Sequence, residues 1–163
     1  IVEDTWDGDD WSAPGGAGEI GERFVGWTTG AKAAVASASA WQKWALASVD
    51  PAAAWTEGPI ALLGDAAHAM APFIAQGGAM AIEDAAVLAE CLAAPDDVES
   101  AFRQYEALRK PRVASVAAKA ARTGSIYHWS PPLALARDVA LRLLGPRLIL
   151  GQNDAVYRWR ARR

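Results

Sequence analysis

One aspartate of this chain stands at a position suited to binding a polar ligand. Asp65 follows the apolar run Ile60–Leu63 and Gly64, so the sequence predicts a carboxylate at the carboxyl end of a buried strand. Open α/β sheets bind their ligands at that end of the strands. An ionised carboxylate only accepts hydrogen bonds. We therefore expect Asp65 to bind hydroxyl groups, such as those of a sugar or ribityl chain.

The segment after Asp65 predicts a helix whose first turn is open to a ligand. From about Gly77, apolar side chains recur at helical spacing, at Ile82, Ala85, Ala89 and Leu92. The sequence Gln76-Gly77-Gly78-Ala79 is nearly free of bulky side chains, which leaves the first amides accessible. Those amides and the helix dipole favour negative charge. The residues alone thus predict a crevice that binds an anion or hydroxyl groups.

The stretch GDAAHAMAPFIAQGGAMAIEDA, residues 64–85, resembles the second FAD-binding motif of the single-component aromatic hydroxylases, which include salicylate and hydroxybenzoate hydroxylases. That pattern runs Gly-Asp-Ala-Ala-His, then Pro, then Gly-Gln-Gly, then an alanine-rich helix with Glu-Asp. The matching residues are Gly64, Asp65, Ala66, Ala67, His68, Pro72, Gln76, Gly77, Glu83 and Asp84. Ala75 replaces the usual first glycine, a variant similar to the salicylate-hydroxylase branch, and Ala79 stands where many members carry asparagine. The segments YEALRKPRV and GSIYHW also resemble that branch.

The resemblance implies roles for individual residues. In the family, the aspartate at the position of Asp65 contacts the ribityl chain, and the amides that open the next helix face the pyrimidine end of the flavin. Donors placed there would stabilise negative charge on the reduced ring. The resemblance implies cofactor binding by Gly64, Asp65, Ala66, Pro72, Gln76, Gly77, Gly78 and Ala79. It places Pro72 in a loop beside the flavin, near where oxygen reacts, which makes Pro72 a candidate catalytic residue. His68 is a second catalytic candidate, but we favour a role for His68 in holding the loop.

The resemblance also implies a fold and an activity. The expected fold is mainly α with a few strands (α+β), the C-terminal part of a hydroxybenzoate-hydroxylase-like FAD/NAD(P)-binding α/β fold without its N-terminal Rossmann unit. The intact enzyme would be a cytoplasmic monooxygenase that uses FAD, O2 and NADH or NADPH on a small aromatic substrate. It would include an N-terminal FAD-binding half that is missing here, with a homodimer as an open alternative. We expect the fragment alone to be inactive.

Three regions are predicted along the chain: the end of a substrate-domain region in 1–57, the strand-loop-helix motif in 58–94, and a helical region in 95–163. Within them, we expect helices at 19–27 and 31–40, a strand at 41–49, and a capping aspartate at 96 or 97. A further helix at 133–144 should end at Gly145-Pro146, before a last short helix from Asp154.

Two patterns near the amino terminus invite other interpretations. Gly16–Gly21 matches G-x-G-x-x-G, but the acidic, turn-like residues before it predict no strand, which a dinucleotide fingerprint requires. The acidic residues Glu3, Asp4, Asp7, Asp9 and Asp10 lack the ligand order of an EF-hand. We interpret the glycine-rich segment as a loop that leads into the helix expected from Glu19, and the acidic segment as a solvent-exposed loop.

Composition limits the possible classes. The chain has 163 residues, 52% of them apolar and 21% charged, enough for one domain with a core. No run of about 18 uncharged apolar residues is present, so we expect no membrane span. A single cysteine, Cys91, excludes a disulfide within this chain, and His68 and His128 are too far apart in sequence to suggest a metal site.

Charge is divided unevenly along the chain. Residues 1–100 hold 3 basic and 16 acidic side chains, a net charge of −13, whereas residues 101–163 hold 13 basic and 3 acidic side chains, a net charge of +10. A basic helical region could bind nucleic acid. Its cations are scattered without a binding motif, so we expect no nucleic acid partner and favour contacts with acidic parts of the protein.

The main alternative function is a catalytically silent helical interaction module derived from an aromatic hydroxylase.

Overall fold

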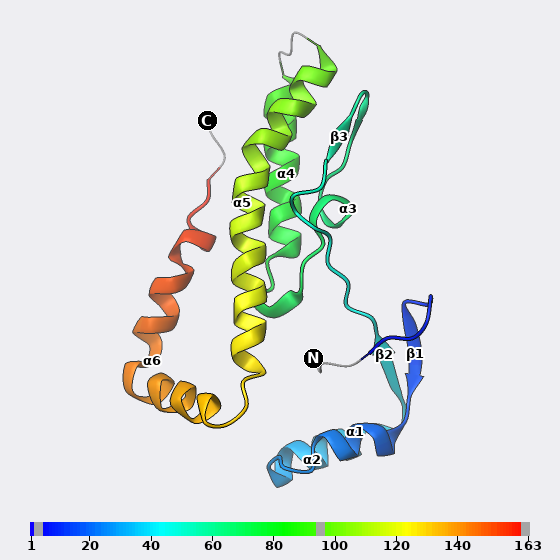
Figure 1. Cartoon of the computed structure of the whole chain (residues 1–163), viewed down its shortest axis with the longest axis vertical. Coiled ribbons are helices and arrows are strands. Elements are labelled where there is room, and N and C mark those ends of the chain that lie inside the picture. The colour runs from blue at the N-terminus through cyan, green and yellow to red at the C-terminus, as the bar shows by residue number, and fades with distance from the viewer. Residues whose placement is uncertain (2–4, 94–96, 161–163) are drawn as a thin grey trace. The chain divides into compact units, whose positions relative to one another are not determined.

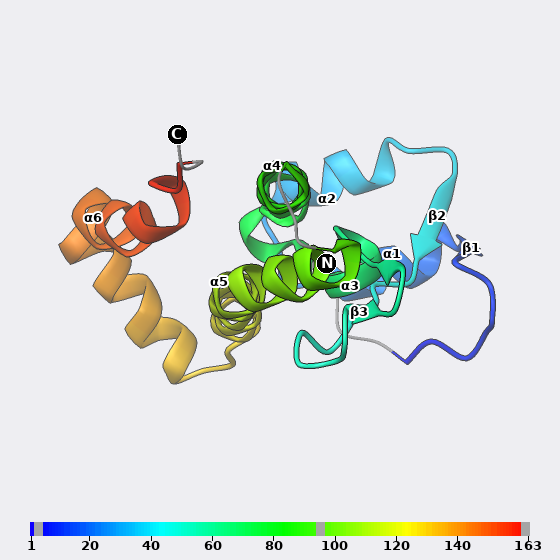
Figure 2. The ribbon, with the colours of Figure 1, turned by 90° about the horizontal axis from the view of Figure 1, so that it is seen from above.

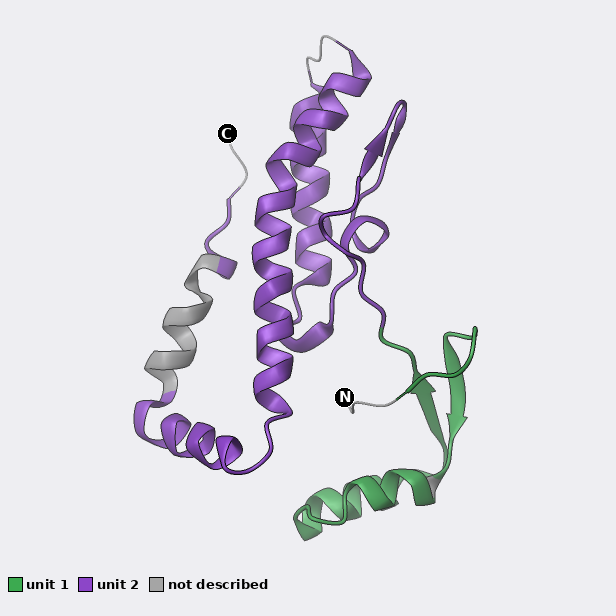
Figure 3. Cartoon of the chain, in the orientation of Figure 1, with its two compact units in different colours: residues 1–46 green, residues 47–163 purple. Residues whose placement is uncertain are grey.

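The computed structural model describes residues 1, 5–93 and 97–160; among these, the side chains of 17 and 146–155 are not described. The chain divides into two compact units, residues 1–46 and 47–163 (Figure 3). Most described residues are helical and the strands are short, so the predicted class, mainly α with a few strands, is confirmed. The three predicted regions 1–57, 58–94 and 95–163 stay a prediction.

The first unit is a strand pair with two helices between its strands in sequence. Strand β1 (Ser12–Gly15) pairs antiparallel with β2 (Trp41–Trp44). Helices α1 (Ala17–Arg23) and α2 (Thr29–Ala36) are shorter than predicted.

The expectation that no strand precedes the G-x-G-x-x-G match at residues 16–21 was wrong, because β1 ends directly before it. The partner of β1 is distant in sequence, so local composition did not indicate the pairing. A dinucleotide fingerprint belongs to a parallel βαβ unit, which an antiparallel pair does not form.

The second unit is organised around two helices that lie side by side (Figures 1 and 2). Helix α4 (Gly77–Leu92) begins at the predicted glycine, and α5 (Val98–Tyr127) follows. The Oδ1 of Asp97 caps α5 by accepting a hydrogen bond from the Ser100 amide at 2.7 Å. The other predicted cap, Asp96, lies outside the described residues. The core of this unit consists of Trp55, Ala67, Met80, Val87, Tyr105, Val113 and Val116.

The apolar run before Asp65 differs from its prediction. Strand β4 covers only Ile60–Ala61 and pairs antiparallel with β3 (Thr56–Glu57). Ile60 is 60% exposed, and Leu62 and Leu63 are 38% and 40% exposed, so the expected buried strand was wrong for this chain. Continuous apolar strands are buried when layers cover both faces of their sheet. The described residues form no such layers around β4.

A compact loop connects β4 to α4. It holds the short helix α3 (Asp65–His68) and the 3-10 helix η1 (Pro72–Ile74). The Phe73 ring packs where a side chain on Gly124 of α5 would stand. Its centroid also lies 6.2 Å from that of Tyr127 and 5.7 Å from that of His128. The loop is therefore held against the carboxyl-terminal end of α5.

Helix α6 (Leu133–Tyr157) has a break at Gly145, where φ is 47° and ψ is −141°. The predicted end of a helix at this glycine is confirmed, since left-handed φ values favour glycine. Helical structure resumes directly after Gly145 rather than at Asp154, so the predicted start of the last helix was wrong. After α6, Trp159 packs against the core of the second unit.

Candidate functional site

The turn before α3 has a conformation that glycine accommodates. Gly64 has φ 60° and ψ −141°, a region that is essentially restricted to glycine. A Cβ atom on Gly64 would also lie 3.2 Å from the Cβ of Ala81 in α4. Asp65 follows as the first residue of α3, with an exposed side chain. The backbone of Gly64 therefore sets where the Asp65 carboxylate lies.

The structure brings Asp65 to the first turn of α4. The Asp65 Oδ1 atom lies 3.7 Å from the position that a Cβ on Gly77 would take. A Cβ on Gly78 would meet nothing within 4 Å. The first amide bonded within the helix is that of Met80, which donates to the Gln76 carbonyl at 2.9 Å. The amides of residues 76–79 therefore lack intrahelical acceptors, as at any helix start. They lie close to the acidic side chain of Asp65.

The other predicted site residues occupy different environments. Pro72 is exposed at the start of η1, and Ala66 is exposed on α3, whereas Gln76 is buried at the start of α4. His68 is 1% exposed and lies in the core, with its ring centroid 5.1 Å from that of Trp55. This burial favours a role for His68 in holding the loop over contact with a ligand.

Asp84 of α4 is a fully buried carboxylate. Its Oδ2 accepts hydrogen bonds from the Gly64 amide at 3.0 Å and from Nε2 of His68 at 2.6 Å. Its Oδ1 accepts a hydrogen bond from Nε of Arg109 at 2.7 Å. Burial by itself raises the pKa of Asp84, but the hydrogen bonds from His68, Arg109 and Gly64 outweigh it and hold that pKa below its usual value. Asp84 is thus a charged acceptor for three donors.

A second carboxylate joins this cluster to the end of the chain. Glu83 accepts hydrogen bonds from Nη1 of Arg109 at 2.8 Å and from Nη2 of Arg112 at 3.0 Å. The same Arg112 atom donates to the carbonyl of Val156 at 2.7 Å. The guanidinium carbon of Arg109 lies 5.8 Å from the centroid of the Trp159 ring, within the range of a cation–π contact. The cluster therefore links α4, α5, the end of α6 and the segment after α6.

Sequence reasoning did not identify this cluster. A local signal was present, because Arg109 and Arg112 are spaced i, i+3 on α5 and so share a helix face. A second signal was the Glu83-Asp84 pair on a helix that is otherwise rich in alanine. The sequence could not show that the two faces meet.

Helix α5 also holds the chain that leads into the turn. The Tyr105 hydroxyl donates to the Leu62 carbonyl at 3.1 Å. Glu106 accepts hydrogen bonds from the Trp55 amide at 3.3 Å and from the Thr56 hydroxyl, and it pairs with Lys110. Burial alone raises the pKa of Glu106, but these three partners outweigh it and lower that pKa. The approach to Gly64 is therefore fixed by hydrogen bonds to α5.

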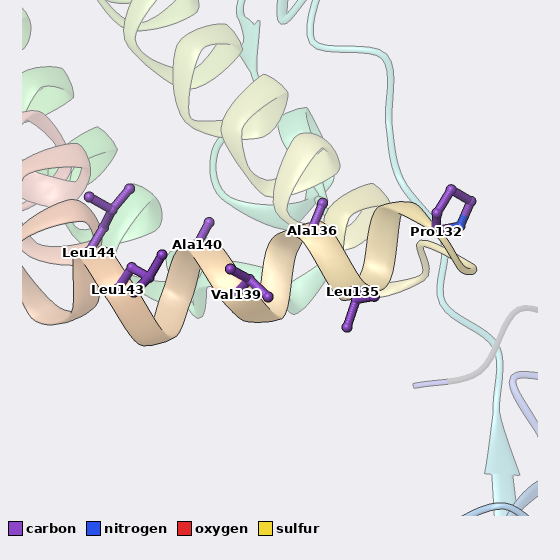
Figure 4. Close-up of a pocket in the computed structure, with 7 residues that line it drawn as sticks. All are labelled: Pro132, Leu135, Ala136, Val139, Ala140, Leu143 and Leu144. Atoms are coloured by element: carbon purple, nitrogen blue, oxygen red, sulfur yellow. The ribbon is translucent and has the colours of Figure 1, made fainter.

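An apolar groove of about 590 Å³ lies along the first half of α6 (Figure 4). It is lined by Pro132, Leu135, Ala136, Val139, Ala140, Leu143 and Leu144. None of these side chains can donate or accept a proton, so the groove offers no catalytic group. Among the residues that the structure describes, no three potential ligands gather into a metal site, and no helix is long and apolar enough to cross a membrane.

Comparison with known protein families gives a match over the site. The model of a family described as "FAD binding domain" matches residues 23–120, which include the Gly64–Asp65 turn, α4 and most of α5. The chain belongs to this FAD-binding domain family. Its resemblance to FAD-dependent aromatic hydroxylases is confirmed by the relatives that follow.

Two curated relatives show what this FAD-binding domain is similar to. It is 41% identical, over 78% of its length, to 3-amino-4-hydroxybenzoate 2-monooxygenase PtmB3 from Streptomyces platensis, of which it covers 33%. It is also 41% identical, over 71% of its length, to 6-hydroxynicotinate 3-monooxygenase from Pseudomonas fluorescens, of which it covers 31%. The chain therefore spans about a third of the length of these relatives.

Solved structures agree with this family. A salicylate hydroxylase in a substrate complex superimposes with a TM-score of 0.75 and 28% identity, covering 94% of this chain and 39% of the other. Klebsiella pneumoniae HpxO, complexed with FAD and uric acid, gives a TM-score of 0.74 and 32% identity, covering 86% of this chain and 37% of the other.

Proposed function

We propose that this chain forms the part of an FAD site that binds the ribityl chain and the pyrimidine edge of the flavin, within an aromatic-ring monooxygenase. One observation carries the proposal: the exposed carboxylate of Asp65 lies beside the open first turn of α4. A hydroxyl-binding acceptor and a set of anion-binding amides are thereby combined in one place.

The residues of the site fit this cofactor. Among the described residues, no group donates a hydrogen bond to the Asp65 side chain, so its oxygens can accept ribityl hydroxyls. Gly64 and Ala66 flank it along the backbone. A Cβ on Gly78 would meet nothing within 4 Å, so the first turn of α4 is open to a ligand at this position.

These positions suggest which steps FAD performs and which roles the residues of the chain have. When bound, FAD supplies the redox chemistry, passing electrons from NADH or NADPH to O2 so that an aromatic ring is hydroxylated. Gln76, Gly77, Gly78 and Ala79 direct their amides at the pyrimidine edge and stabilise negative charge there. Pro72, exposed on η1, borders the flavin on the side of the substrate, and His68 holds the loop from within the core.

We further propose that an N-terminal half outside this chain provides the remaining FAD contacts and the site for a small aromatic substrate. The relatives are about three times as long as the matched region, which supports this. Exposed apolar side chains near the turn also support it, since apolar surface of this kind marks contact with other protein. They are Ile60, Leu62, Leu63 and Ile82. A homodimer of the whole enzyme stays a prediction.

Titration of the chain with FAD, followed by flavin fluorescence, tests the proposal. We expect saturable binding that Asp65→Ala weakens by about tenfold or more, because an acceptor for the ribityl hydroxyls is lost. The helical circular dichroism should stay unchanged, since Asp65 is exposed. Glu99→Ala, which removes an exposed acidic side chain at the start of α5, is the matched control and should leave the affinity unchanged.

Equal FAD affinity of Asp65→Ala and the unsubstituted chain would refute the role of Asp65. If the chain alone binds no FAD, the same two variants are compared after fusion to the N-terminal half of a relative. Absence of FAD from that fusion would favour the catalytically silent interaction module.

A further inference from the structure

We propose that Asp84 is the positioning residue of the FAD site: it holds both ends of α3, and so the carboxylate of Asp65, without touching the cofactor. Its effect on FAD affinity rests on the proposed function above. Its effect on the turn is a property of this chain alone.

The geometry of the carboxylate carries the proposal. Gly64 directly precedes α3 and His68 is its last residue, and both donate to the same oxygen, Oδ2 of Asp84, at 3.0 and 2.6 Å. Asp65 lies between these two donors in the chain. Because Asp84 is 0% exposed, water does not replace either hydrogen bond. One buried side chain therefore anchors the segment at both ends.

One face of α4 contacts this turn at three positions. Gly77, Ala81 and Asp84 are spaced i, i+4 and i+7, so they share a face of the helix. Gly77 lies against the Asp65 carboxylate, and Ala81 lies against Gly64. Asp84 completes the row by binding the Gly64 amide and His68. The face thus sets the orientation of Asp65 relative to the first turn of the same helix.

Arg109 allows Asp84 to act as a charged acceptor inside the core. Its Nε donates to Oδ1 of Asp84 at 2.7 Å, whereas the Gly64 amide donates to the other oxygen, Oδ2. A buried carboxylate without a partner would take up a proton or destabilise the fold. Arg109 is itself 2% exposed and is held by Glu83 and by the ring of Trp159. It acts on the turn only through Asp84.

A pair of neighbouring substitutions separates positioning from general stability. Asp84→Asn and Glu83→Gln each remove one negative charge from the same cluster. An Asn side chain has one acceptor oxygen and no charge, so it either leaves Gly64 and His68 without an acceptor or offers them only a neutral oxygen, with its NH2 group facing the Arg109 donor. Glu83 binds Arg109 and Arg112 but makes no hydrogen bond to Gly64 or His68. Only the first substitution should therefore release the turn.

Amide hydrogen exchange at Gly64, measured by NMR, reports on the turn without FAD. In Asp84→Asn, we expect Gly64 exchange to accelerate about tenfold or more relative to a core amide such as that of Val113. In Glu83→Gln, the ratio of the two rates should stay as in the unsubstituted chain. Equal changes of this ratio in both variants, or no change in either, would overturn the proposal.

FAD affinity gives the second measurement. We expect the dissociation constant to rise about tenfold in Asp84→Asn and less than about threefold in Glu83→Gln. If Gly64 exchange responds as expected but no form binds FAD, even after fusion to the N-terminal half of a relative, the positioning role holds and the proposed cofactor role fails. If FAD affinity falls equally in the two variants while exchange at Gly64 does not distinguish them, the positioning role fails.

A double variant covers the case in which Asp84→Asn does not fold. Asp84→Ala with Arg109→Met removes both members of the buried pair, so no guanidinium is left unpaired in the core. It still deprives Gly64 of its acceptor. Glu83→Ala with Arg112→Met is the matched control, and the same difference in Gly64 exchange is expected between the two double variants.

Discussion

At the scale of single residues, the charge of Asp84 links stability to pH. Hydrogen bonds from His68, Arg109 and Gly64 outweigh burial and lower its pKa in the folded chain. The ionised form therefore contributes stability that is fully present above the unfolded pKa of about 3.9 and is lost as the pH falls through the lower folded pKa.

The lowered pKa of Asp84 gives a prediction for the dependence of unfolding on acid pH. The free energy of unfolding of the unsubstituted chain should exceed that of Asp84→Asn at pH 5, and the difference should shrink below about pH 4. Urea unfolding at several pH values measures it. Glu99→Gln, at an exposed pair with Arg103, is the control and should show little dependence on pH. A difference that is the same at pH 5 and pH 3 would contradict the prediction.

Ala75 is a second residue whose conformation has a measurable consequence. It is left-handed, with φ 51° and ψ 41°, and it stands where the family pattern has glycine. We expect Ala75→Gly to raise the free energy of unfolding by roughly 0.5–1 kcal/mol, because glycine accepts this conformation without steric cost. Ala89→Gly, in the exposed interior of α4, is the contrasting control and should lower it by about 0.5–1 kcal/mol. Thermal unfolding would show opposite shifts, and shifts of the same sign would contradict the explanation.

At the scale of elements, the loop between α3 and α4 packs against α5 at Gly124, where the helix has no side chain. The Phe73 ring occupies the space that a side chain at Gly124 would need, and we call this space the Gly124 notch. We expect Gly124→Ala to lower the free energy of unfolding by about 1–3 kcal/mol through overpacking. Chemical denaturation of purified variants measures this change.

The same notch supplies an internal control. With Phe73→Ala already present, Gly124→Ala should be neutral or stabilising, because alanine favours helix over glycine by about 1 kcal/mol. The double-mutant cycle therefore isolates the contact between ring and helix. Additive effects of the two substitutions would show that the notch does not hold the loop.

At the scale of the whole molecule, the two units differ in how their side chains are buried. All members of the hydrophobic core lie in residues 47–163, and no described side chain of residues 1–46 falls in the buried class. We expect a chain of residues 47–163 to unfold cooperatively, with a free energy of unfolding within about 1 kcal/mol of that of the full chain, because its buried apolar surface is intact. Urea unfolding of both chains tests this, and loss of cooperativity in the shorter chain would contradict it.

Features that depend on a few neighbouring residues could be predicted from the sequence. The start of α4 at Gly77, the cap at Asp97 and the break at Gly145 all follow from local backbone chemistry. The motif around Asp65 also led to the FAD-binding domain family, because its residues are contiguous. The roles assigned to the individual site residues are proposals that the experiments above address.

Other features were decided only by the tertiary structure. The Asp84 contacts to Gly64 and Arg109 join residues that are 20 and 25 positions apart, and Phe73 meets Gly124 across a longer separation. The exposure of Ile60 likewise depends on which layers surround β4. The sequence by itself determined the local elements and the motif, since these arise from adjacent residues. The fold decided which helix faces meet, because burial and ion pairing depend on the path of the whole chain.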